Sequence, residues 1–373
     1  MQGYVGVSLG TCNVETLYRT FGMALPLLYQ WCGKIWEESE VTDMKNKINV
    51  SISVFEQNFM AAKHAYVLNS SMEASACASA FIGSTSPIDE ERLRMAKKVV
   101  RGNTGFLSTL GRGNASQIVA ATIAAEPDMQ VAMEQIVQIH GELNRRFFNS
   151  DYLVLAAVMI YRNAEVSERM AVVDRMRKIY TGMRKSHPLL TGREDLANVA
   201  LMALSGIPLE ELGRREKVLF DEAKRYYVMK GKAQYLSCML SVFEGEPAEM
   251  ARHAKETQNV LKTYGVRFDS TAFPVIGAVS ALVDSKDLEL IGASIRDCSA
   301  QLKAIRGMGA MGAGKRIRNM IATAIVLDAY TSDADAKVRS SVSAAIISAI
   351  IATEIAIIVA ATTASAAAAS SSS

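Results

Sequence analysis

The sequence predicts an all-α fold, an α-solenoid-like array of antiparallel helix pairs with an apolar helix near the C-terminus. Apolar segments recur along the chain with starts 35 to 45 residues apart, a period typical of helical repeats. Charged stretches with apolar residues spaced by three and four lie between them, as on one helix face. No sustained alternation of apolar and polar residues occurs, so we predict no strand.

Six apolar segments define the first helix of each pair. They mix Leu, Val, Ile and Met with small residues, and they span residues 118–125, 153–161, 196–204, 235–243, 275–283 and 320–327. A helix that is apolar on every side is a buried one. We therefore predict that these segments are inner helices.

The stretches between them predict half-exposed outer helices. Residues 129–147, 170–183 and 291–305 carry apolar residues on one helical face and charged residues on the other. Turns with Pro127, Pro208 and Pro247 separate the segments, and proline is favoured near a helix start. Asp284 is a further candidate N-cap. The alternative is an irregular helical bundle whose regular spacing is accidental.

The chain is organised around residues 186–204, a helix end, a turn and the next helix. Pro188 cannot continue a helix. Thr191 and Glu194 have the spacing of a capping box, in which each side chain satisfies a free backbone N–H. Leu201 lies in the all-apolar segment and is predicted to be buried. We assign structural roles to Pro188, Thr191, Glu194 and Leu201.

Composition divides the chain into three regions. Residues 1–45 are an N-terminal extension, 46–333 the helical-repeat domain, and 334–373 an apolar tail rich in Ala and Ser. The extension lacks the features of a signal peptide, which leaves an extra helix or untranslated sequence upstream of Met44. A net charge of +3 gives no reason to expect nucleic-acid binding.

No residue set indicates a catalytic, cofactor or metal site. Cys12, Cys32, Cys77, Cys238 and Cys298 are scattered, and the last three are predicted to be buried thiols of a cytosolic protein. No C-x-x-C or H-E-x-x-H occurs. The four histidines His64, His140, His187 and His253 share no metal-ligand spacing, so we assign them structural roles.

The glycine-rich stretch 307–315 matches two phosphate-loop patterns. It satisfies both G-x-G-x-x-G and G-x-x-x-x-G-K, but the preceding residues have a helical period where both motifs need a strand. Arg316 also stands where a magnesium-binding Ser or Thr is required. An inter-repeat loop is the better interpretation.

Basic residues gather with aromatic ones in two places. Arg145 and Arg146 precede Phe147 and Phe148, and a second group holds Arg175, Arg177, Lys178, Arg184 and Lys185. Nucleic-acid binding would need one continuous basic stripe, which Glu142, Glu168 and Asp174 interrupt. We interpret these residues as solvated helical faces.

The tail has the length but not the composition of a membrane span. Residues 340–373 carry one charge, Glu354. A span needs about 20 apolar residues, whereas a carboxylate within lipid is costly. A helix packed on the last repeat or on a partner is preferred. Membrane association through residues 342–361 is the alternative.

Several landmarks resemble the bacterial family called Domain of Unknown Function 4003. They are FEQNF at 55–59, NTGFLSTLGRGN at 103–114, NSDYLVLAA at 149–157, SHPLLTGRED at 186–195, QYLSCMLSVFEGEP at 234–247 and GKRIRNMIATAIVLD at 314–328. The resemblance covers about residues 55–330. It implies no activity and no catalytic residue.

These observations favour a cytoplasmic, non-enzymatic scaffold that binds another protein. Helical arrays offer long surfaces and few chemical sites. The alternatives are a membrane-associated cytoplasmic protein and an enzyme whose site is assembled from several helices. A cluster of buried ionisable groups in one deep pocket would favour the enzyme.

Overall fold

The computed structural model describes residues 25–66, 70–105, 108–112, 115–332, 349–350 and 353. For residues 25–40 and 112 it describes the backbone only. Every regular element in these ranges is helical. The predicted all-α class is therefore confirmed for the described part of the chain.

The chain divides into two units, residues 1–47 and residues 48–373. Helix α2 (Leu25–Ala65) runs across this boundary. In the first unit, Lys47 and Asp43 lie one helical turn apart, and their Nζ and Oδ2 atoms are 2.9 Å from each other. Such exposed pairs stabilise a helix by a few tenths of a kcal/mol at most, about 0.2–0.5 kcal/mol.

The second unit holds the other helices whose bounds the structure describes. In chain order they are α3 (Ser71–Ser79), α4 (Glu90–Gly102), α5 (Thr109–Arg112), α6 (Ser116–Ala124), α7 (Met129–Asn144), α8 (Asp151–Asn163), α9 (Arg169–Ser186), η1 (Arg193–Asp195), α10 (Leu196–Leu204), α11 (Leu209–Ala223), α12 (Lys230–Leu240), α13 (Pro247–Thr263), α14 (Pro274–Leu282), η2 (Ser285–Asp287), α15 (Leu288–Ala304) and α16 (Gly314–Thr331).

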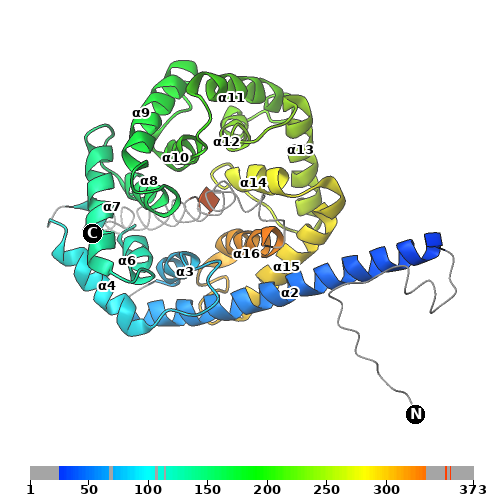
Figure 1. The fold of residues 1–373 in the computed structure, drawn as a ribbon, viewed down its shortest axis with the longest axis horizontal. Helices are drawn as coiled ribbons and strands as arrows, with labels where there is room; N and C mark the ends of the chain where they lie inside the picture. The colour runs from blue at the N-terminus through cyan, green and yellow to red at the C-terminus, as the bar shows by residue number, and fades with distance from the viewer. Residues whose placement is uncertain are drawn as a thin grey trace, which may run out of the picture. The chain divides into compact units, whose positions relative to one another are not determined.

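The helices of this unit form an inner and an outer row (Figure 1). Along the inner row, α6, α8, α10, α12, α14 and α16 each pack against the next, and α7, α9, α11, α13 and α15 do the same outside. The six apolar segments predicted to be inner helices coincide with this inner row. In α10, all residues from Leu196 to Ala203 are buried, Leu201 among them, as predicted.

Within the second unit, the region around α15 contacts α2. Gln301 on α15 donates a hydrogen bond from Nε2 to Oδ1 of Asn49 on α2, at 3.5 Å. A Cβ atom placed on Gly307 would lie 3.2 Å from Cζ of Phe59, also on α2. The last helix pair therefore packs against the first elements of the same unit.

Several predicted helix boundaries are confirmed. The Asp128 carboxylate accepts hydrogen bonds from the backbone N–H groups of Gln130 and Val131, which caps α7. Glu246 caps α13, which begins with Pro247. Helix α9 ends at Ser186, two residues before Pro188. Asp284 precedes the short helix η2 but makes no capping hydrogen bond with its side chain.

The glycine-rich stretch is a loop between two helices, α15 and α16. The backbone N–H of Ala313 donates to the carbonyl of Gly307 at 3.0 Å, which folds the loop on itself. A helix, not a strand, precedes the loop, as its period predicts. The nucleotide-binding patterns in this sequence therefore lack their structural context.

Three cysteines, Cys77, Cys238 and Cys298, are free and buried, in agreement with the prediction. His140 is buried on α7, as its position on the apolar face predicts. The apolar tail segment 342–361, for which membrane association was the alternative expectation, lies outside the described residues except for 349, 350 and 353, which are helical and buried. In the described part of the chain, no helix has the length and apolarity that a membrane crossing requires.

Candidate functional site: an arginine–aromatic pocket

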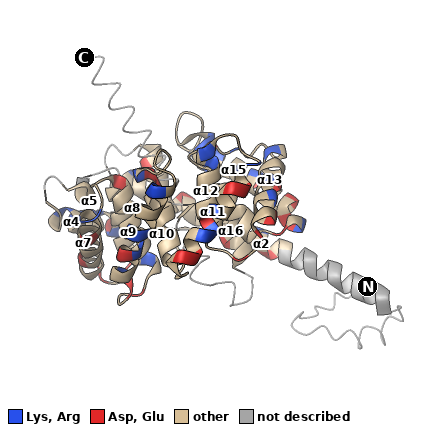
Figure 2. Ribbon diagram, turned by 90° about the horizontal axis from the view of Figure 1, so that it is seen from above, with Lys and Arg blue, Asp and Glu red and all other residues tan. Residues whose placement is uncertain are grey.

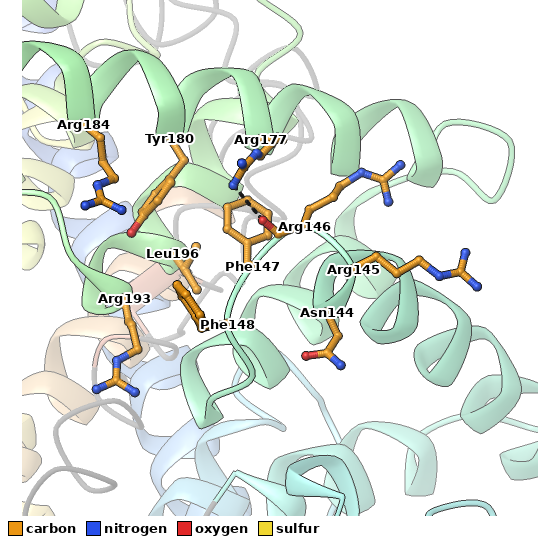
Figure 3. A pocket seen from close by; sticks show the side chains of 10 residues that line it. All are labelled: Asn144, Arg145, Arg146, Phe147, Phe148, Arg177, Tyr180, Arg184, Arg193 and Leu196. Atoms are coloured by element: carbon orange, nitrogen blue, oxygen red, sulfur yellow. Dashed lines mark hydrogen bonds between the residues drawn. The ribbon is translucent and has the colours of Figure 1, made fainter.

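A surface pocket in the second unit gathers arginine and aromatic side chains (Figure 3). Its volume is about 420 Å³, within the range of small-ligand sites. We call it the arginine–aromatic pocket. It is lined by Asn144, Arg145, Arg146, Phe147, Phe148, Arg177, Tyr180, Arg184, Arg193 and Leu196.

Three pieces of backbone bring these residues together. Helix α7 is followed by a turn in which the N–H of Phe147 still donates to the carbonyl of Leu143, at 2.9 Å. On α9, Arg177, Tyr180 and Arg184 are spaced by three and four residues and so share one face. The turn between α9 and α10 supplies Arg193.

One wall of the pocket is aromatic. The rings of Phe147 and Tyr180 meet edge to face, with centroids 5.4 Å apart. The guanidinium of Arg177 lies 5.8 Å from the centroid of the Phe147 ring, and its Nη1 donates to the carbonyl of Arg146 at 2.7 Å. These contacts orient the Arg177 cation at the wall without neutralising its charge.

Phe148 differs from its neighbour in being almost fully accessible. Its side chain is 86% exposed, although large apolar side chains are usually covered. Like Leu196 and Arg193, it lines the pocket (Figure 3). An exposed aromatic ring at a pocket offers a flat apolar surface to a ligand or a partner.

The pocket has an excess of positive charge. Two carboxylates stand beside it: Glu142 pairs with both Arg145 and Arg146, and Asp174 pairs with Arg146 at 2.8 Å. Among the described residues, no carboxylate forms an ion pair with Arg177, Arg184 or Arg193. Their three guanidinium groups carry the local excess.

The excess of positive charge at the pocket contrasts with the mixed charges on the other described helices. Lys and Arg are interspersed with Asp and Glu over the helices of the chain (Figure 2), in keeping with a net charge of +3. The positive charge at the pocket is therefore a local cluster and not a consequence of the charge of the whole protein.

The turn that supplies Arg193 differs from the predicted capping box. The Thr191 hydroxyl is buried and accepts a hydrogen bond from Gln234 on α12, at 3.3 Å. The backbone N–H of Gly192 donates to Oδ2 of Asp195, at 2.8 Å. Asp195 takes the role that was predicted for Glu194, because a 3-10 turn precedes α10 and moves its start to Leu196.

The side chains of Arg193 and Asp195 lie on opposite sides of this turn, one exposed and one buried. Arg193 lines the exposed pocket, whereas Asp195 is fully buried. Burial raises the pKa of the Asp195 carboxyl to about 7, against the smaller opposite effect of the Gly192 hydrogen bond. The turn is therefore anchored from inside by a carboxyl group and presents a cation outside.

Further buried polar groups lie behind the turn. Oγ of Ser237 donates to Oε1 of Glu216 at 2.9 Å, and Nε2 of His187 lies 3.6 Å from the same oxygen. Burial raises the pKa of Glu216 and raises that of the Cys238 thiol well above its usual value. A protonated thiol is a poor nucleophile. None of these four side chains lines the arginine–aromatic pocket.

The chemistry available at the pocket is binding of an anion. Guanidinium groups recognise carboxylate and phosphate oxygens, and aromatic walls exclude water. The described residues contain no group of three His, Cys, Asp or Glu side chains that could hold a metal ion. The residues predicted to be structural, Pro188, Thr191, Glu194 and Leu201, do not line the pocket.

The basic residues were interpreted from the sequence as solvated faces, and Arg145, Arg177, Lys178, Arg184 and Lys185 are exposed. The structure also places several of these residues together. It brings Arg145, Arg146, Arg177 and Arg184 into one pocket. Arg175 turns away and donates to the carbonyls of Ala203 and Ile207. Sequence reasoning missed Tyr180 and Arg193. The spacing of Arg177, Tyr180 and Arg184 was the available signal for one shared face.

Comparison with known proteins gives a family and no activity. A family model described as protein of unknown function (DUF4003) matches residues 35–364. No curated protein and no solved structure shows a significant match. Because the family model covers most of the chain, the protein belongs to this family of unknown function.

Proposed function

We propose that this protein is a cytoplasmic, non-enzymatic scaffold that binds an acidic segment of another protein in the arginine–aromatic pocket. The single observation that carries the proposal is the set of three guanidinium groups, Arg177, Arg184 and Arg193, which no described carboxylate pairs. In this proposal the inner and outer helices are the repeats of an α-solenoid-like array that carries the pocket on its surface.

Interface composition supports a protein partner. Aromatic residues and arginine are enriched at protein interfaces, and they supply most of the residues that dominate binding energy. Phe148 beside the pocket is 86% exposed, and Leu189 in the turn after α9 is 97% exposed. Both side chains would lose contact with water on binding a partner, which is favourable for apolar surface.

Burial argues for binding over catalysis. Three acidic groups whose pKa burial raises, Asp195, Glu216 and Cys238, are covered by protein and do not line the pocket. General acids and bases must reach the proton that they transfer. The free buried cysteines fit a cytoplasmic protein, because disulfides form mainly in oxidising compartments.

Binding of labelled peptides tests the proposal. A peptide rich in Asp and Glu should bind, and its Asn and Gln counterpart should not, in fluorescence anisotropy at low salt. The double variant Arg184→Ala/Arg193→Ala should weaken binding at least tenfold. Both side chains are exposed, so the variant should remain folded.

A matched control comes from α11. Arg214 is exposed and pairs with Glu211 at 2.8 Å, outside the pocket. Arg214→Ala removes one positive charge of the same kind, where the pocket variant removes two, and should leave peptide affinity unchanged. If Arg214→Ala and the pocket variant lose peptide affinity equally, the peptide binds through general surface charge, and the proposal is wrong.

A further inference from the structure

We infer that the preferred anion of the arginine–aromatic pocket is a phosphate monoester on an aromatic ring, a phosphotyrosine side chain in the partner segment. This inference rests on the proposed function and narrows it. Three features of the pocket carry it: the amount of unpaired charge, the aromatic walls and the scarcity of neutral hydrogen-bonding groups.

The unpaired charge fits a dianion better than a carboxylate. Arg177, Arg184 and Arg193 line the pocket with no carboxylate partner among the described residues. One Asp or Glu side chain supplies a single negative charge, whereas a phosphate monoester carries about −1.5 to −2 at pH 7. Its three terminal oxygens can also accept hydrogen bonds from more than one guanidinium.

The volume and the aromatic walls of the pocket fit a ligand in which an aromatic ring carries the phosphate. A volume of about 420 Å³ is more than a phosphate group fills. Phe147 and Tyr180 form an ordered edge-to-face pair, and the exposed ring of Phe148 stands at the same pocket. A phenyl ring would pack against these rings in offset or edge-to-face contacts. A phosphoserine side chain would leave them in water.

The remaining polar groups favour a phenyl ring over a nucleotide base. Apart from the guanidinium groups, the lining side chains offer only the Asn144 amide and the Tyr180 hydroxyl as hydrogen-bonding groups. A base presents several donors and acceptors, each of which loses water on burial and needs a partner. The ring of phosphotyrosine presents none, so the pocket matches it without further partners.

Arg177 has a separate role from the other two cations. Its guanidinium stands over the ring of Phe147 and bonds the carbonyl of Arg146. In Figure 3, Arg184 and Arg193 extend free of drawn hydrogen bonds, with the Tyr180 hydroxyl between them. We assign the phosphate oxygens to Arg184 and Arg193, and the aromatic ring to the wall that Arg177 supports.

The test compares four peptides of one acidic sequence that differ at the central residue: phosphotyrosine, tyrosine, phosphoserine and glutamate. Isothermal titration calorimetry with the full chain should give at least tenfold tighter binding for phosphotyrosine than for each of the others. Phe148→Ala should remove most of the preference for phosphotyrosine over phosphoserine. Arg184→Ala/Arg193→Ala should remove the preference over tyrosine, and Arg214→Ala should change neither.

The outcomes separate this inference from the proposed function. If the four peptides bind equally and the pocket variant weakens all of them, the pocket binds acidic segments and the phosphotyrosine inference is wrong. If no peptide binds, both proposals fail. Adenosine monophosphate is the small-molecule comparison: tighter binding of this nucleotide than of the phosphotyrosine peptide would overturn the assignment to a protein segment.

Discussion

Gln234 on α12 donates a hydrogen bond from Nε2 to the hydroxyl oxygen of Thr191, at 3.3 Å, in the buried interior. The two residues are 43 positions apart in the chain. This contact ties the turn between α9 and α10 to the next inner helix. The same turn carries Arg193, so the position of one pocket cation depends on a hydrogen bond formed behind it.

Thr191→Val should destabilise the protein by about 1–3 kcal/mol, because the buried Gln234 amide would lose its acceptor. Glu194→Ala is the matched comparison, since the exposed Glu194 carboxylate accepts no capping bond from Thr191 in this turn. It should change the free energy of unfolding by less than about 0.5 kcal/mol. Urea denaturation measures both. If both variants lose a similar amount of unfolding free energy, Thr191 and Glu194 form the capping box predicted from the sequence, and the hydrogen bond from Gln234 to Thr191 is wrong.

Leu201→Ala should cost about 2–5 kcal/mol, the usual range for a leucine truncated in a core. Leu201 is 1% exposed within α10, an inner helix in contact with α8, α9 and α12. Chemical denaturation of the variant gives the value. A cost below about 1 kcal/mol would mean that the inner row is loosely packed at this position.

Asp195 should make stability fall as pH rises. Burial raises its folded-state pKa to about 7 from its ordinary value of 3.8, so the native state binds more protons than the unfolded state between these pH values. The stability held at low pH is then lost as pH rises towards 7, by up to about 4 kcal/mol. Asp195→Asn keeps an oxygen for the Gly192 N–H and removes the titration.

The difference between wild type and Asp195→Asn isolates this effect from other carboxylates. Unfolding free energies measured at pH values from 4 to 8 should show wild type losing stability relative to the variant. Parallel curves would show that Asp195 is ionised in the native state with an ordinary pKa.

Gly312→Ala should destabilise the loop before α16, whereas Gly309→Ala should be tolerated. A Cβ atom on Gly312 would lie 1.7 Å from the carbonyl oxygen of Gly307, which the Ala313 N–H holds in place. A Cβ atom on Gly309 meets no atom within 4 Å. Thermal unfolding of both variants provides the test. If the two variants unfold at the same temperature, the loop in solution does not have the turn in which Ala313 bonds the Gly307 carbonyl.

Phe148→Ala should leave the thermal midpoint within about 1 °C of wild type, because an 86% exposed ring contributes little burial. Phe147→Ala should lower it, since Phe147 packs on Tyr180 and lies beneath Arg177. Differential scanning calorimetry of the two variants compares neighbouring residues of one type. A marked loss in Phe148→Ala would show that its ring is buried in solution.

The sequence by itself determined the six inner helices and the outer helices within residues 129–147, 170–183 and 291–305. Apolarity on every side identified the inner segments, and a period of three and four residues identified outer ones. Pro127 and Pro247 stand at the turns before α7 and α13, as predicted. Helix formation and amphipathicity depend on residues three and four positions apart, so this information is local. The burial of Cys77, Cys238 and Cys298 followed from the same reasoning.

Only the tertiary structure decided the turn and the pocket. The Thr191 hydroxyl bonds a residue on another helix, which no local spacing reveals. The pocket joins the end of α7, one face of α9 and a 3-10 turn, and each piece taken alone resembles an ordinary solvated surface. Arg193 becomes part of it because packing in space, and not separation along the chain, sets which charges stand together without a counter-ion.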